Sequence, residues 1–379
     1  MTAAAEPPRP HAELRGDGAP PPGEGWQPLR RRGVTFGQVR SLPGSAPAPA
    51  AALANWRAAE PVFVPAALDK GLEQQREAIT QTLRMFERLR RGQRFLDELE
   101  LRLCDDEVLR YAGSTVDRND PREIERVFVN AVTGYAPAVR DLWAKLSWIA
   151  DDESDSSLRI RFSYGLDQHT DWLRATAEQR EWLDQFAGRV FPECAAVLES
   201  PTLQAQLRNV LGQPFACRER IIYNNAPGGG AVFHHDADPG QLGVVYSQLA
   251  GETAWLALSK SRLAELLVAA EAATDATQAM RDLDLCLQAH HETSDTPAAQ
   301  QLWQLLNRDP AFTARLARAG ALYVLQAGDS ILLPSHDIDR VAWHSVIALG
   351  RRPSLGHSYA LDAADEAADE KACRTDPGG

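Results

Sequence analysis

The sequence predicts an α+β protein in which a β sandwich or barrel is joined to two helical regions. Short β-rich runs separated by Gly, Pro and Asn begin near residue 218, and this texture is typical of sandwiches and barrels. Before that point, apolar residues recur at helical spacing within residues 65–147 and 170–198. Helical spacing returns between about 259 and 319, which indicates a helical insertion within the β core.

The first 50 residues are rich in Pro and Ala, as in the runs PPRP and PGSAPAPAAA. Such a composition buries little apolar surface, and therefore cannot offset the entropy lost when the backbone is ordered. We expect residues 1–50 to form a disordered arm. The acidic, Ala-rich end of the chain is expected to be a flexible tail over residues 363–379.

Between these ends, residues 51–200 are expected to form a helical region. Residues 201–362 are expected to hold the β core, with the helical insertion at residues 259–320. The runs with strand character lie near 220–223, 231–233, 243–246, 253–258, 321–325, 330–333, 343–349 and 355–361.

Composition and charge exclude several classes of protein. Of the 379 residues, 44% are hydrophobic and 24% are charged, which is the balance of an ordinary globular protein. The formal net charge of −12 repels phosphate backbones and anionic lipids, so neither nucleic acid nor membrane is an expected partner. No apolar run approaches the roughly 20 residues of a membrane helix, and no signal peptide is evident, so we expect a cytoplasmic protein. The five scattered cysteines form no CxxC pair and are expected to be reduced thiols.

The main chemical signal is the pair His234 and Asp236, one residue apart, together with His344, which lies 110 positions after His234. A ferrous site for oxygen chemistry takes two neutral imidazoles and one carboxylate on one face of the metal. Alternate residues of a strand project to the same side, so His234 and Asp236 can converge while His235 points elsewhere. We therefore predict that His234, Asp236 and His344 are metal ligands and catalytic residues. His336 is a rival to His344 for the third position.

Three stretches accompany these residues: a Tyr-containing strand with a glycine-rich turn at 223–230, a Gly-Glu-Thr turn at 251–253, and a Gly-Asp strand at 328–333. In this order they resemble the double-stranded β-helix oxygenases that use ferrous iron and 2-oxoglutarate, including prolyl-hydroxylase-like and Jumonji-type members. The likeness covers roughly residues 218–361. It implies a double-stranded β-helix core of the jelly-roll or cupin-like kind.

Arg352 and Ser354 follow His344 by eight and ten residues. In related oxygenases an Arg-x-Ser at about this place binds the distal carboxylate of 2-oxoglutarate, because a guanidinium presents two parallel donors to a carboxylate. The resemblance therefore implies that Arg352, Ser354 and Tyr223 bind the cosubstrate. Arg351 competes with Arg352, since the two face opposite sides of an extended strand.

The resemblance implies an Fe(II)- and 2-oxoglutarate-dependent dioxygenase that uses O2 and oxidises a C–H bond. The presence of Asp236 argues for hydroxylation or a related oxidation, because halogenating members lack this carboxylate. A small metabolite or amino-acid derivative is the expected substrate, and a protein or peptide substrate, as in Jumonji-like hydroxylases, stays open. Two further classes stay open as well: a cupin-type dioxygenase that does not use 2-oxoglutarate, and a non-catalytic β-helix binding protein. The oligomeric state cannot be read from the sequence.

Overall fold

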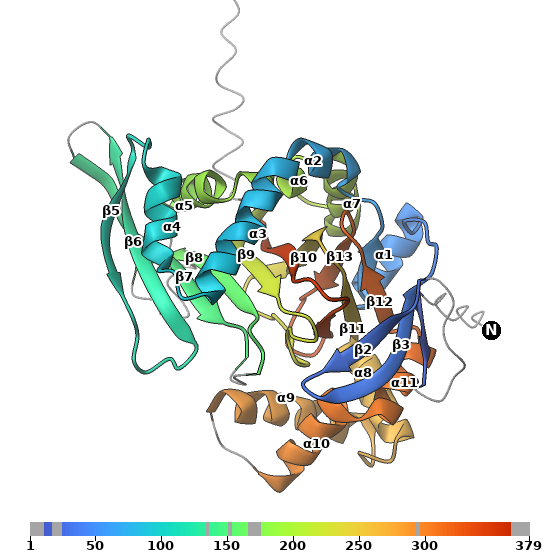
Figure 1. Ribbon diagram of the computed structural model, residues 1–379. Coiled ribbons are helices and arrows are strands. Elements are labelled where there is room, and N and C mark those ends of the chain that lie inside the picture. Colours follow the sequence, from blue (N-terminus) through green and yellow to red (C-terminus); the bar gives the residue numbers. More distant parts are fainter. Residues whose placement is uncertain are drawn as a thin grey trace, which may run out of the picture.

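The computed structural model describes residues 11–16, 25–133, 136–150, 154–165, 176–292 and 296–364. Among these residues a main antiparallel sheet crosses the molecule (Figure 1). In order across the sheet, its described strands are β4 (Val62–Val64), β13 (Ser330–Pro334), β10 (Gln241–Ala250), β15 (Ser354–Ala363), β9 (Phe215–Asn225), β8 (Leu158–Tyr164), β7 (Ala136–Trp148), β6 (Glu123–Thr133) and β5 (Leu109–Thr115).

A second antiparallel sheet, of β12 (Leu322–Leu325), β11 (Thr253–Ser259) and β14 (Ala342–Ala348), faces one end of the main sheet. Between the two sheets lies an apolar layer. Tyr246 and Leu333 enter this layer from the main sheet, and Trp255 and Val346 enter it from the second sheet. The two sheets therefore form a sandwich, as the strand texture of the sequence predicts.

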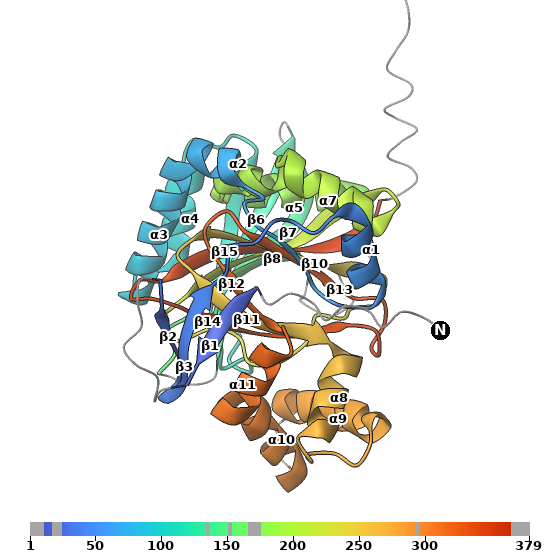
Figure 2. The ribbon, with the colours of Figure 1, turned by 90° about the vertical axis from the view of Figure 1, so that its right-hand side faces the viewer.

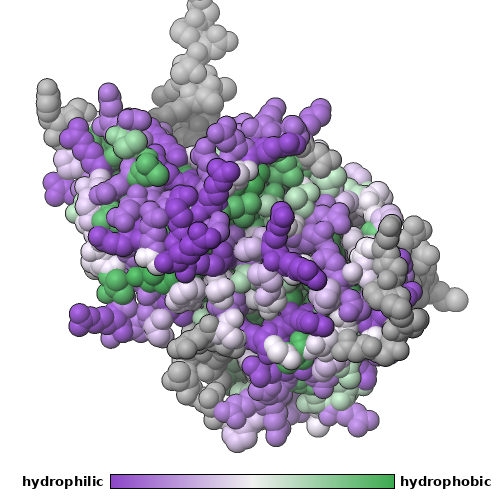
Figure 3. Space-filling view, viewed as in Figure 1, coloured by the Kyte–Doolittle hydropathy of each residue, from purple (hydrophilic) through white to green (hydrophobic). Residues whose placement is uncertain are grey.

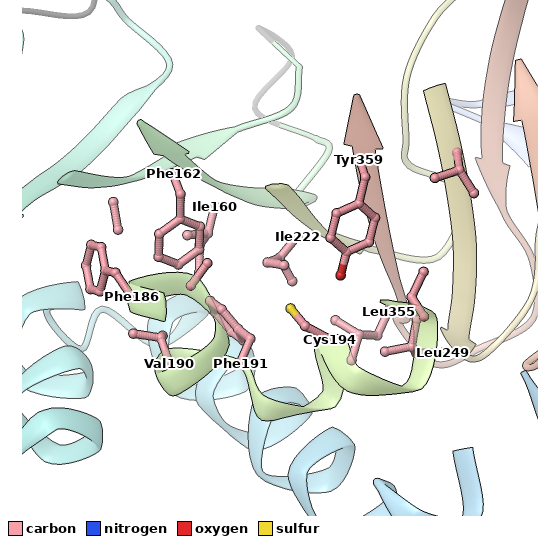
Figure 4. Close-up of a cluster of buried hydrophobic side chains, with 14 of the residues drawn as sticks. Ile160, Phe162, Phe186, Val190, Phe191, Cys194, Ile222, Leu249, Leu355 and Tyr359 are labelled. Carbon is pink, nitrogen blue, oxygen red and sulfur yellow. The ribbon is translucent and has the colours of Figure 1, made fainter. Parts of the chain in front are cut away.

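One group of helices covers the outer face of the main sheet (Figure 2). It comprises α1 (Pro49–Arg57), α2 (Asp69–Gln74), α3 (Arg76–Arg90), α4 (Phe95–Leu103), α5 (Ala177–Val190), the 3₁₀ turn Pro192–Cys194, α6 (Ala195–Leu198) and α7 (Pro201–Leu211). In α3 the residues Ile79, Phe86 and Leu89 recur at helical spacing and are buried, so this helix packs by an apolar stripe. The rings of Phe162, on β8, and Phe186, on α5, meet edge to face with their centres 5.1 Å apart (Figure 4).

This core also buries a carboxyl group. Glu193 is fully buried, and its Oε1 atom lies 3.7 Å from Nε2 of His357 on β15. Burial raises the pKa of Glu193 to about 7, against the partial compensation of the Arg102 guanidinium. The folded state therefore binds this proton more tightly than the unfolded chain, whose carboxyl titrates near its ordinary value. As a result, the free energy of unfolding should fall as the pH rises from about 4.5 to about 7.

We expect Glu193→Gln to remove this pH dependence, because the amide cannot ionise. The variant should gain stability relative to the wild type between pH 5 and pH 8 by roughly 3 kcal/mol. Urea unfolding of both proteins at the two pH values measures the difference. Parallel stability profiles of wild type and variant would show that Glu193 does not carry this charge penalty.

A second group of helices lies between β11 and β12 in the chain, within the predicted insertion. It comprises α8 (Lys260–Ala269), α9 (Ala276–Glu292), α10 (Pro297–Arg308) and α11 (Pro310–Arg318). These helices pack with Leu256, Leu258 and Trp343 on the outer face of the second sheet. Both ribbon views place them on the side of the sandwich opposite the first group (Figures 1 and 2).

Two predictions about the N-terminal half need correction. Residues 1–50 are not wholly a disordered arm, because β1 (Ala12–Arg15), β2 (Gln27–Arg31) and β3 (Val34–Ser41) form a three-stranded sheet. Leu29, Phe36 and Val39 are buried in the same cluster as the second sheet and α11. The arm is therefore ordered by apolar contacts with distant parts of the chain, which composition alone does not reveal.

The second correction concerns residues 51–200, which are not helical throughout. The strands β5, β6, β7 and β8 extend the main sheet within this range. In β6 and β7, the buried residues Val127 and Val129, and Leu142 and Ala144, join the core beneath the first group of helices, which is a period of two rather than a helical one. The division of the chain into domains stays a prediction, and residues 365–379 of the expected tail lie outside the described residues.

The face of the molecule in Figure 3 is largely hydrophilic, and its hydrophobic side chains are scattered. Among the described residues, no helix combines the length and apolar character needed to cross a membrane.

Candidate metal centre

The segment between β9 and β10 carries His234 and Asp236 and runs beside β14. The backbones of His234 and His344 exchange two hydrogen bonds of 3.0 and 2.8 Å. Earlier in the segment, the carbonyl groups of Ala231 and Gly229 accept bonds from the amides of Val346 and Ala348. This pairing brings together two histidines that are far apart in the sequence.

Arg31, on β2, stabilises this pairing through hydrogen bonds to both segments. Its guanidinium donates to the Ser345 hydroxyl at 2.9 Å and to the Ala231 carbonyl at 2.8 Å. The side chain is buried, and burial lowers the pKa of Arg31 to about 9. Sequence reasoning missed this residue because Arg31 lies in the part of the chain expected to be a disordered arm.

His234, Asp236 and His344 form the candidate centre. Nε2 of His234 lies 3.5 Å from Asp236 Oδ1, and Nε2 of His344 lies 3.5 Å from Asp236 Oδ2. One donor atom from each residue falls within 4.8 Å of the others. Two imidazoles and one carboxylate at such spacing can hold a divalent metal and leave other coordination positions open.

The surroundings of each imidazole suit metal binding. Nδ1 of His234 is 2.7 Å from the Val232 carbonyl, and donation there leaves the Nε2 lone pair facing Asp236. The buried His344 ring stacks on Trp255, with centres 5.4 Å apart and planes 19° from parallel. Burial lowers the pKa of His344 to about 3, so this imidazole is neutral near pH 7. A neutral imidazole is the form that binds metal.

The charges within the centre favour an ionised carboxylate. Burial by itself would raise the pKa of Asp236, but the neighbouring His234 and His344 imidazoles hold it below its ordinary value. Burial would likewise lower the pKa of His234, yet the Asp236 carboxylate raises it. The donor set is therefore two imidazoles and a carboxylate, and it fits the predicted iron site.

A cavity of about 30 Å³ adjoins the candidate centre. This volume holds a metal ion and a water molecule or two, so a larger ligand requires side chains to move. The polar side chains Tyr223, Asn225, Tyr246 and Ser358 line it from the main sheet. No Lys or Arg of the described chain is among the lining residues.

The other predicted site residues lie in different places. Arg352, like Arg351, is exposed in the turn before β15, so the prediction that Arg352 enters the barrel is wrong. The strand begins only at Ser354, which is buried and accepts a 3.4 Å hydrogen bond from the Asn225 side chain. Tyr223 lines the cavity, and its binding of the cosubstrate stays a prediction.

The rival ligand His336 lies outside the candidate centre. Its Nε2 atom is 2.8 Å from the carbonyl oxygen of Trp56, on α1. His235 turns away from the centre as expected, and its ring meets the Trp343 ring edge to face. The structure therefore brings His344, and not His336, to the His234 and Asp236 pair.

No protein-family model and no curated protein matches the chain. Solved structures do match. YcfD, a ribosomal oxygenase from Escherichia coli, shares 14% identity over 75% of this chain with a TM-score of 0.25, and this chain spans about half of YcfD (49%). The α-ketoglutarate-dependent epimerase SnoN from nogalamycin biosynthesis shares 14% identity over 84% of each chain, with a TM-score of 0.32.

An oxidoreductase of the 2OG-Fe(II) oxygenase family from Burkholderia pseudomallei shares 12% identity over 85% of this chain and 98% of its own, with a TM-score of 0.30. These TM-scores lie below 0.5, so the alignments carry no argument about the site. What the chain does must be argued from its own residues.

Proposed function

We propose that this chain is a non-haem iron(II)- and 2-oxoglutarate-dependent oxygenase with a double-stranded β-helix core. The observation that supports the proposal is the meeting of His234, Asp236 and His344 at one point between two sheets. Iron(II) bound there would supply the redox chemistry with O2 and the 2-oxo acid. The net reaction consumes 2-oxoglutarate, O2 and a C–H bond, and it yields succinate, CO2 and a C–OH group.

The chain's own residues would bind the metal, orient its ligands and shield the cavity from water. His234, Asp236 and His344 would hold the metal by one face, and the Trp255 ring keeps the His344 imidazole in position. The apolar layer around Val244, Leu333 and Val346 excludes bulk water from the cavity. Cosubstrate entry requires the cavity to widen.

We propose a small metabolite or amino-acid derivative as substrate, with a protein or peptide as the alternative. The cytoplasmic location stays a prediction.

One observation favours a second candidate, a cupin-type dioxygenase that does not use 2-oxoglutarate. The cavity has no lining cation, among the described residues, to receive a distal carboxylate. The two candidates differ in one product, since only the first forms succinate.

The test is succinate formation in air from iron(II) and 2-oxoglutarate without added substrate. We expect slow turnover by the wild type and none above the protein-free background by Asp236→Ala. Asp238→Ala is the matched control, because Asp238 lies two residues further on and is exposed. A wild type that binds iron but forms no succinate above background would reject the 2-oxoglutarate proposal in favour of the cupin-type candidate.

A further inference from the structure

The position on β15 that lies opposite Tyr223 cannot carry a long cationic side chain. Gly356, on β15, lies opposite Gln248 on β10 and opposite Tyr223 on β9. A Cβ atom added to Gly356 would overlap the hydroxyl end of Tyr246. That hydroxyl donates to the Gln248 side chain at 3.1 Å, and Gln248 also accepts from the Thr253 hydroxyl at 2.7 Å. The Tyr246 ring therefore fills the space on this side.

The row of residues across the main sheet that contains Gly356 and Tyr223 also contains a cation, Arg159. Ser147, Arg159, Tyr223 and Gly356 lie opposite one another on β7, β8, β9 and β15. Directly opposite residues of antiparallel strands project to the same face. Because Tyr223 lines the cavity, Arg159 lies on the cavity side of the sheet, one strand beyond it.

Arg159 is a cation whose side-chain contact is with a hydroxyl group. Its Nε atom donates to the Ser147 hydroxyl at 3.1 Å, and it makes no ion pair with a described carboxylate. Burial lowers the pKa of Arg159 below its ordinary value. Its charge is close enough to act on the Tyr223 hydroxyl and the His234 imidazole. A half-buried guanidinium in this position is stabilised by an incoming carboxylate.

Two neighbouring arginines already have other partners and do not compete with Arg159 for an incoming carboxylate. Arg161, two residues further along β8, already pairs with Glu219 at 2.8 Å. Arg31 donates to Ser345 and to backbone carbonyls behind β14.

We infer that Arg159, on β8 of the main sheet, binds the distal carboxylate of the cosubstrate in place of Arg352. This inference rests on the proposed function. It assigns the discrimination between 2-oxoglutarate and 2-oxo acids that lack a distal carboxylate to Arg159 on β8. It also accounts for the absence of a cation among the described residues that line the cavity. The positive charge lies on β8, one strand beyond Tyr223.

The experiment compares two ligands that differ only at the far end. 2-Oxoglutarate carries the distal carboxylate, and 2-oxopentanoate has a methyl group there. Each is titrated anaerobically into the iron(II)-loaded full-length protein, with the visible charge-transfer band and the thermal midpoint as readouts. We expect the wild type to bind 2-oxoglutarate about 10- to 100-fold more tightly than 2-oxopentanoate.

In Arg159→Met that preference should disappear, while the affinity for 2-oxopentanoate and for iron(II) stays within about twofold. Arg159→Lys should keep part of the preference, because it retains the charge but not the planar pair of donors. Arg161→Met is the matched control, on the same strand and face, and should keep the full preference. An unchanged thermal midpoint of the ligand-free variants verifies folding.

Arg159→Met with the wild-type preference would overturn the inference, since the distal carboxylate would then be bound elsewhere. An equal loss in Arg161→Met would also overturn it, because the effect would then come from general charge. Failure of the proposed function has a different signature: the wild type would bind iron(II) but neither acid.

Discussion

His344→Ala is expected to weaken iron(II) binding by at least about 100-fold, since even the hydrogen-bond partners of metal ligands contribute 10- to 100-fold. His344 supplies the second imidazole of the candidate centre, and its Nε2 atom faces Asp236 at 3.5 Å. The remaining pair, His234 and Asp236, would leave the metal with two protein donors. Anaerobic competition against a chelator of known affinity measures the loss.

His336→Ala is the matched control for this experiment. The two histidines are eight residues apart in the sequence, but His336 contacts the Trp56 carbonyl and not the candidate centre. The control should bind iron(II) as the wild type does. Equal weakening by both substitutions, or by neither, would show that His344 is not a ligand.

Gly230→Ala is expected to lower the free energy of unfolding by about 2–4 kcal/mol. Gly230 has a φ of +124°, and a Cβ atom added there would lie 2.5 Å from the carbonyl oxygen of Val346. That carbonyl belongs to β14 and cannot yield without breaking the pairing that seats His234 beside His344. The substitution should therefore weaken iron(II) binding as well.

Gly240→Ala separates the two causes of this loss. Gly240 also has a positive φ, +84°, but a Cβ atom added there meets nothing within 4 Å. It should cost only the conformational strain of a left-handed residue, about 1 kcal/mol. Urea unfolding of both variants, monitored by tryptophan fluorescence, gives the comparison. A loss in Gly230→Ala no larger than in Gly240→Ala would show that the close approach to β14 is relieved without cost.

The candidate centre could be predicted from the sequence because its chemistry is local. His234 and Asp236 are separated by one residue, and the strand-like run around His344 sets its direction. Arg352 could not be placed in this way. Its side depends on where β15 begins, and a shift of one residue in a strand reverses the face of every side chain. The strand begins at Ser354, which leaves Arg352 in the turn.

Arg159 also escaped prediction, although a signal was present. Leu158, Ile160 and Phe162 alternate with Arg159 and Arg161, which is the period of a strand with one polar face. That alternation shows which side chains share a face, but it does not show which other strand lies beside them. Only the pairing of β8 with β9 brings Arg159 next to Tyr223.

The sequence by itself determined the alternation of strands after residue 218, the helical insertion between β11 and β12, and the two imidazoles and one carboxylate as candidate ligands. Each of these follows from residue type and short-range period. Only the tertiary structure decided that His344 rather than His336 joins the pair, that β1 to β3 are ordered, and that Arg352 stays outside the cavity. The reason is physical: these outcomes depend on strand register and on contacts between segments far apart in the chain, which no local pattern specifies.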